Sequence, residues 1–230
     1  MRDKGRTRTV IACRALRPEL EALLAGSGDK TIHVRYLDQN LHRTPEHMTG
    51  VIQAAIAEEK DDTAQIVLGY GLCSNGVVGL QAPEQGLIIP RAHDCISFFL
   101  GSREEYQAAF KNYPGAYYLT PGWIKEQKDP LGNMENDYVP RVGRQEAVWA
   151  AKEELKHYTR LVLIYSATTS NPEELQRRAE ENARFFDKEL EIRQGSDAYF
   201  RKILFGPHDE DAFLRIPAGE VVRQRPFLDM

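Results

Sequence analysis

Short runs of apolar residues recur along the chain and predict strands. In TIHVRYL, Ile32, Val34 and Tyr36 fall on one face of an extended segment, which is the period-two pattern of a strand. Further strands are expected at TVIA (residues 9–12), QIVLGYG, GLIIP, GAYYLT, RLVLIYSA and LEIRQG. The tail after residue 217 carries a weaker pattern, in which Glu220–Val222 is expected to pair at a sheet edge.

Helical stripes separate most of these runs. Met48, Ile52 and Ile56 fall on one stripe, with Thr44 as the expected N-cap and Pro45 at the first helical position. Strands that alternate with helices of this length imply a mainly parallel sheet with right-handed crossovers. We therefore expect an α/β fold of flavodoxin/Rossmann-like type, with helices on both faces of the sheet.

The domain organisation follows from the same pattern. The 230 residues suffice for one domain with a sizeable core. The segments VIACRAL…TIHVRYLD and VLIYSATTSNPEEL…LEIRQG both indicate a strand, a short loop, a helix that begins with proline, and a strand. We expect a single domain over residues 1–230, with two pseudo-repeated lobes at residues 1–120 and 121–230 as an open alternative.

Composition and charge exclude several classes of protein. A net charge of −4 argues against a general nucleic-acid binder, which would carry a basic patch. No apolar run approaches the roughly 20 residues that span a bilayer. The apolar segment that follows the basic start ends before Arg14 and is too short for a signal peptide. We expect a cytoplasmic protein that binds neither nucleic acid nor membrane.

The three cysteines of the chain all lie close to the expected ends of strands. Cys13 ends the first strand, Cys73 follows the third in GYGLCSNG, and Cys95 follows the fourth in IIPRAHDC. Ligands of parallel sheets bind outside the carboxyl ends of the strands, so the three side chains are expected at one edge. Thiolates are ligands of zinc and of iron–sulfur clusters, and His93 could add a nitrogen. The alternative is that each cysteine is a small buried hydrophobe.

Two histidines and one aspartate are candidates for proton transfer. His42 lies on the loop after the second strand, and His93 and Asp94 follow the fourth. Asp94 could orient His93 or act as a base. The alternatives are a solvated loop histidine at position 42 and a helix-capping aspartate at position 94.

The glycines around Cys73 indicate a tight turn. Gly71, Asn75 and Gly76 are the positions where backbone N–H groups could approach an anionic cofactor. The stretch is neither a P-loop nor a dinucleotide-binding fingerprint, so nucleotide binding is a weak option. Trp123, in YLTPGW, could form the wall of a pocket or pack in the core.

Taken in order, ACRAL, LHRTPEHM, YGLCSNG, HDCISFFLGS and GAYYLTPGW resemble the family DUF1638, whose bacterial and archaeal members are uncharacterised. The resemblance runs from about Val10 to about Tyr199 and points to Cys13, His42, Cys73, His93 and Cys95. The sequence departs from the family pattern at Leu72, where an acidic residue is common, and at Asp94, which separates His93 from Cys95. The resemblance also implies an association with corrinoid-dependent methyltransferase systems.

These observations support one leading hypothesis and two alternatives. The leading hypothesis is a metal-binding protein or metal-dependent enzyme with zinc or an iron–sulfur cluster on Cys13, Cys73 and Cys95. Its setting would be corrinoid-linked one-carbon metabolism, and its partner a small-molecule substrate or a corrinoid methyltransferase system. The alternatives are a non-catalytic small-ligand or corrinoid-handling module and an interaction protein, both with structural cysteines. The oligomeric state stays open.

Overall fold

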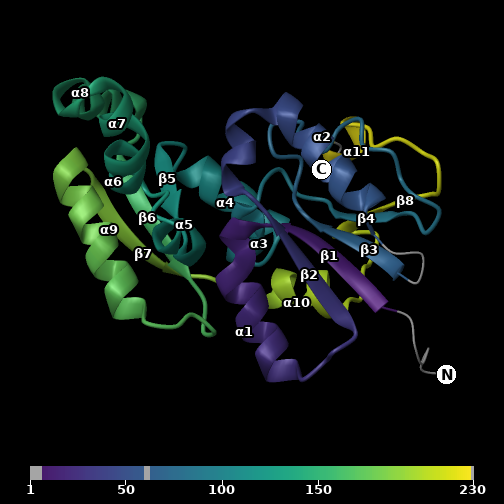
Figure 1. Cartoon of the computed structure of the whole chain (residues 1–230). Coiled ribbons are helices and arrows are strands. Elements are labelled where there is room, and N and C mark those ends of the chain that lie inside the picture. The colour runs from purple at the N-terminus through teal and green to yellow at the C-terminus, as the bar shows by residue number, and fades with distance from the viewer. Residues whose placement is uncertain (1–6, 60–62, 229–230) are drawn as a thin grey trace.

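The computed structural model describes residues 7–59 and 63–228 and shows a mixed α/β fold (Figure 1). The larger sheet has the strand order β2-β1-β3-β4-β8. Its strands are β1 (Thr7–Cys13), β2 (Ile32–Leu37), β3 (Thr63–Gly69), β4 (Leu87–Pro90) and β8 (Phe213–Ile216). The first four are mutually parallel, and β8 pairs antiparallel with β4. The expected α/β fold with a mainly parallel sheet is confirmed.

Helices cover both faces of the larger sheet, as the sequence predicts. Alternate residues of β1 point to opposite sides: Val10 packs into one buried cluster and Ile11 into another. The first cluster includes residues of α1, α3 and α10, and the second includes residues of α2 and α11. These helices are α1 (Arg17–Ser27), α2 (Pro45–Ala57), α3 (Ile96–Leu100), α10 (Ala198–Phe205) and α11 (Arg225–Leu228).

A second, all-parallel sheet has the order β5-β6-β7. Its strands are β5 (Ala116–Leu119), β6 (Arg160–Tyr165) and β7 (Glu189–Gln194). The helices that follow in this region are α5 (Pro121–Lys125), α6 (Pro130–Asn133), α7 (Val139–Val142), α8 (Arg144–Glu154) and α9 (Pro172–Phe186), with a π-helical turn η3 (Met134–Tyr138). We call this sheet with α5–α9 the small lobe, and the larger sheet with its helices the large lobe.

The two lobes are joined by a shared core and by chain crossovers. The helix α4 (Arg103–Asn112) leads from the large sheet into β5, and the chain returns to the large lobe after β7. Val162 and Ile164 of β6 belong to the same buried cluster as Val10 of β1. Figure 1 shows the carboxyl ends of β1 and β2 directed toward the small lobe. The boundaries expected at residues 1–120 and 121–230 stay a prediction.

Two further segments, residues 121–142 and the C-terminal tail, lie outside the two sheets. The segment 121–142, which contains several prolines, glycines and asparagines, forms short helical pieces from α5 to α7. The tail makes one isolated antiparallel bridge, between Gln81 and Val221. Among the described residues, no helix is both long enough and apolar enough to cross a membrane.

Candidate functional site

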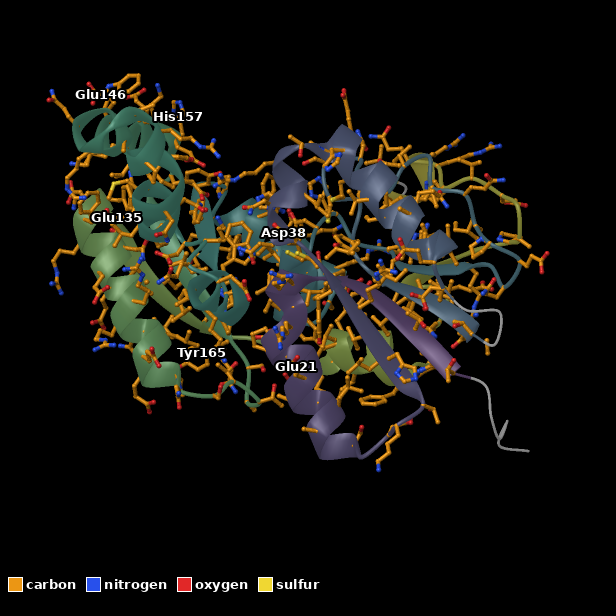
Figure 2. The ribbon with its side chains drawn as sticks, in the orientation of Figure 1. Glu21, Asp38, Glu135, Glu146, His157 and Tyr165 are labelled. Atoms are coloured by element: carbon orange, nitrogen blue, oxygen red, sulfur yellow. The ribbon has the colours of Figure 1, made fainter. Side chains whose placement is uncertain are left out.

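The carboxyl edge of the large sheet collects the residues that the sequence singled out. Cys13 ends β1, and His42 lies in the turn η2 (Gln39–Arg43) that follows β2. Cys73 follows β3, and His93 with Cys95 follows β4. Because these strands are parallel, the residues after them share one edge. Figure 2 shows Asp38, the first residue after β2, where the large lobe faces the small lobe.

The three cysteines do not form a metal centre. Among the described residues, no group of three or more histidine, cysteine, aspartate or glutamate side chains could hold a metal ion. Cys73 packs against the cluster on one face of the sheet and Cys95 against the cluster on the other, while Cys13 contacts both. The prediction of a metal site on these cysteines with His93 is therefore wrong.

The expectations that rested on that centre lose their support. Zinc or an iron–sulfur cluster as the cofactor stays an untested prediction. The link to corrinoid-dependent methyl transfer rested on the resemblance, and nothing in the arrangement of these residues adds support to it.

The thiols stay protonated in this environment. Burial raises the pKa of Cys13 to about 12 and raises the pKa values of Cys73 and Cys95 well above their usual range. All three are free and half-buried. A neutral thiol is a weak nucleophile, so these residues act here as small, weakly polar packing groups.

Two buried polar side chains at this edge have no partner. Tyr70, directly after β3, and Gln39, in η2, are each only 3% exposed. The hydroxyl of Tyr70 and both polar atoms of the Gln39 amide lack a hydrogen bond among the described residues. Burial raises the pKa of Tyr70 strongly, with further contributions from the three cysteines and Asp38, so its hydroxyl keeps its proton.

Sequence reasoning missed Tyr70 and Gln39. Tyr70 lies near the end of the predicted strand QIVLGYG, and Gln39 follows the predicted strand TIHVRYL, but many residues so placed pack without a function. Their distinguishing property is a buried polar atom with no partner, which depends on the tertiary surroundings. No local pattern of residues reports it.

His42 connects this edge to the small lobe. Its ring stacks on Trp123 of α5, with the ring centroids 5.4 Å apart. Its Nδ1 contacts the backbone carbonyl oxygen of Gln39, which places the ring hydrogen on Nδ1. Desolvation lowers the pKa of His42, so the neutral ring with a free Nε2 is favoured. Trp123 thus contacts a residue of this edge, and its role as the wall of a pocket stays a prediction.

His93, Asp94 and Tyr106 form a hydrogen-bonded group at the other end of the edge. Asp94 Oδ1 accepts from the backbone N–H of Ile96 at 2.9 Å, and Asp94 Oδ2 accepts from the hydroxyl of Tyr106 at 2.8 Å. His93 Nδ1 lies 3.3 Å from Asp94 Oδ2, and its ring stacks on that of Tyr106. The hydrogen bond to Asp94 raises the pKa of His93. Asp94 therefore both caps a backbone N–H and orients the histidine.

The turn around Cys73 is strained, and its two glycines are closely packed. Cys73, Ser74 and Asn75 have φ values of 46°, 56° and 71°, a left-handed conformation that L-residues adopt at a cost of roughly 1–2 kcal/mol each. A Cβ at Gly76 would lie 1.8 Å from Met48 Cε, and one at Gly71 would lie 2.7 Å from the Ala92 carbonyl oxygen. Both glycines thus permit close approach of neighbouring segments. Their predicted role in cofactor binding, with Asn75, stays a prediction.

The small lobe makes several direct contacts with the β1 and β2 side of this edge. Gly122 of α5 approaches so closely that a Cβ would lie 1.9 Å from the Ala15 carbonyl oxygen. Arg14 lies 3.9 Å from Glu126, and Arg43 lies 3.4 Å from Asp137. The segments that follow β1 and β2 at this edge therefore belong to the interface between the lobes.

Comparison with known proteins gives a family and no function. The family described as "Protein of unknown function (DUF1638)" matches residues 36–204. No curated protein and no solved structure matches the chain. The match begins after Cys13 and includes His42, Cys73, His93 and Cys95. With most of its length matched, this α/β chain belongs to the DUF1638 family.

Proposed function

We propose that the protein binds a small, neutral, polar molecule at the carboxyl edge of the large sheet, where the small lobe covers it. The observation that carries this proposal is the pair of buried polar side chains without partners, Tyr70 and Gln39. A buried polar group that loses its hydrogen bonds to water costs about 1–3 kcal/mol. A ligand that supplies the missing hydrogen bonds removes this cost.

The surroundings define the chemistry of the ligand. Tyr70 keeps its proton and offers a hydrogen-bond donor, and the carboxamide of Gln39 offers both a donor and an acceptor. The three thiols at this edge are also neutral. An uncharged ligand with a carbonyl or amide group fits this set best, because a full charge would be poorly solvated there.

The strand order limits the size of the ligand. His42 follows β2 and His93 follows β4, with β1 and β3 between them. Neighbouring strands lie about 4.8 Å apart, so the edge between these strands spans about 14 Å. A molecule of metabolite size fits along it, with Trp123 and His42 at one end and His93 at the other.

The experiment compares two tyrosines whose hydroxyls are both buried and unpartnered. Tyr70 lies at the proposed site, whereas Tyr36 lies on β2 under the guanidinium of Arg17. The protein is purified under native conditions and denatured, and released small molecules are identified by mass spectrometry. A panel of uncharged carbonyl and amide metabolites is then screened by thermal shift.

We expect a ligand that stabilises the wild type and Tyr36→Phe alike. Tyr70→Phe is expected to weaken binding about 10-fold, the value of one lost hydrogen bond of about 1.4 kcal/mol. Equal binding to Tyr70→Phe and wild type would place the ligand elsewhere. A wild-type protein that binds no member of the panel and releases none would contradict the proposal and favour an interaction protein.

A further inference from the structure

The geometry around Asp94 assigns the hydrogen of the neutral His93 ring. Nδ1 faces Asp94 Oδ2 at 3.3 Å and the oxygen of Tyr106 at 3.4 Å. Tyr106 donates its own hydrogen to Asp94, so its oxygen is free to accept one. Two acceptors at Nδ1 require the hydrogen to lie there, which leaves the lone pair on Nε2.

The same contacts hold the ring in place and leave its far side open. Tyr106 lies on α4 and stacks on His93 with the ring planes 19° apart, and Phe110 stacks on Tyr106 one helical turn later. The side chain of His93 is nevertheless 55% exposed. Its orientation is thus set by Asp94 and Tyr106 on one side, and Nε2 is accessible to a bound molecule.

We propose that His93 is a general acid–base residue that moves a proton on a small carbonyl compound bound at this edge, with Asp94 and Tyr106 as positioning residues. This inference rests on the proposed function and adds a reaction to it. A histidine whose Nδ1–H is directed at a carboxylate is the arrangement that supports proton transfer at Nε2.

The protons and charges of the step balance within the site. Nε2 takes a proton from a C–H or N–H next to the carbonyl, and the electron pair of that bond stays on the ligand as an enolate or its nitrogen equivalent. Asp94 stabilises the imidazolium, whose charge pairs with that of the enolate. The imidazolium then returns the proton to the ligand, so that no oxidant or reductant is needed.

Backbone hydrogen bonds fix the segment that carries His93. The N–H of Leu72 donates to the carbonyl of Ala92 at 2.8 Å, and the N–H of Cys73 donates to the carbonyl of His93 at 2.9 Å. The loop after β3, which begins with Tyr70, is thereby fixed to the loop after β4. The backbone of the segment that carries His93 is therefore held in place by the loop after β3.

The test measures hydrogen exchange into bound carbonyl compounds. Dihydroxyacetone, hydantoin and any ligand released from the native protein are incubated with the enzyme in heavy water, and deuterium uptake is followed by NMR. We expect His93→Gln to slow the enzyme-dependent exchange at least about 100-fold, which is the usual value of one general base. His47→Gln, on the exposed side of α2, is the matched control and should exchange as the wild type does.

The roles of Asp94 and Tyr106 in positioning His93 are tested by measurements that a merely structural role would leave unchanged. Asp94→Asn is expected to lower the pKa of His93 in an NMR titration and to move the acidic limb of the rate profile to lower pH. Tyr106→Phe should slow exchange with unchanged ligand affinity, whereas Tyr113→Phe, on the turn after α4, should leave both unchanged.

The outcomes separate this inference from the proposed function. Exchange that is lost in His93→Gln while affinity changes less than about threefold supports the inference. If the wild-type protein binds a carbonyl compound but does not speed its hydrogen exchange above the rate in solvent, the inference is overturned and the binding proposal stands. A failure of all the compounds to bind overturns both.

Discussion

Glu19 is the clearest single-residue anomaly outside the proposed site. It lies in the first turn of α1, is 2% exposed, and has no hydrogen-bond partner for either carboxyl oxygen among the described residues. Burial raises its pKa to about 8; Lys125 opposes this shift and Asp197 adds to it. The group is therefore protonated at neutral pH in the folded protein and ionised in the unfolded chain.

The sign of the pH effect follows from that difference. The folded-state pKa lies above the unfolded value of 4.5, so stability falls as the pH rises from about 4.5 to about 8. Glu19→Gln removes this loss and is expected to stabilise the protein by about 2–4 kcal/mol at pH 8.5, with little effect at pH 4.5. Urea unfolding at the two pH values measures the difference in the free energy of unfolding.

Glu21→Gln, on the same helix and paired with Arg17, is the control and should not gain stability at pH 8.5. Equal stability of wild type and Glu19→Gln at pH 8.5 would contradict the assignment.

At the scale of single elements, the repeating apolar patterns predicted the parallel strands and their helices correctly. The antiparallel strand β8 was missed because its four residues pair with β4 more than a hundred positions away, and no local pattern records that pairing. The carboxyl edge was predicted from the parallel direction of the expected strands alone. That direction does not say to which face of the sheet each loop side chain turns, which is why Cys73 and Cys95 were wrongly joined in one centre.

Two glycines in helices differ in whether their surroundings leave room for a side chain. Gly50 lies inside α2, and a Cβ there would meet no atom within 4 Å. Gly50→Ala is therefore expected to stabilise the protein by about 0.5–1 kcal/mol, because alanine has the higher helix propensity. Gly122→Ala is expected to destabilise it by about 2–4 kcal/mol, since its Cβ would lie 1.9 Å from the Ala15 backbone oxygen. Thermal melting of both variants tests the pair, and a Gly122→Ala protein as stable as wild type would show that α5 can shift away.

At the scale of the whole molecule, the shared core determines whether the two lobes unfold together. The cluster that contains Val10 of the large sheet also contains Ile164 of the small sheet, with Phe98 and Phe200 from the helices between them. All four side chains are fully buried. Hydrophobic contacts of this kind couple the folding of the segments that make them. The lobes are therefore expected to unfold together, despite their separate sheets.

Cooperative unfolding can be measured with two probes. Far-UV circular dichroism reports both lobes, and the fluorescence of Trp123 in a Trp149→Phe protein reports the contact between them, where Trp123 stacks on His42. We expect the urea transitions followed by the two probes to coincide.

Ile164→Ala should destabilise the protein by about 2–4 kcal/mol and shift both transitions equally, because it opens a cavity in the common core. Ile192→Ala, which is 39% exposed on β7, should shift neither by more than about 1 kcal/mol. Two separate transitions, of which only one responds to Ile164→Ala, would mean that each lobe is stable without the other.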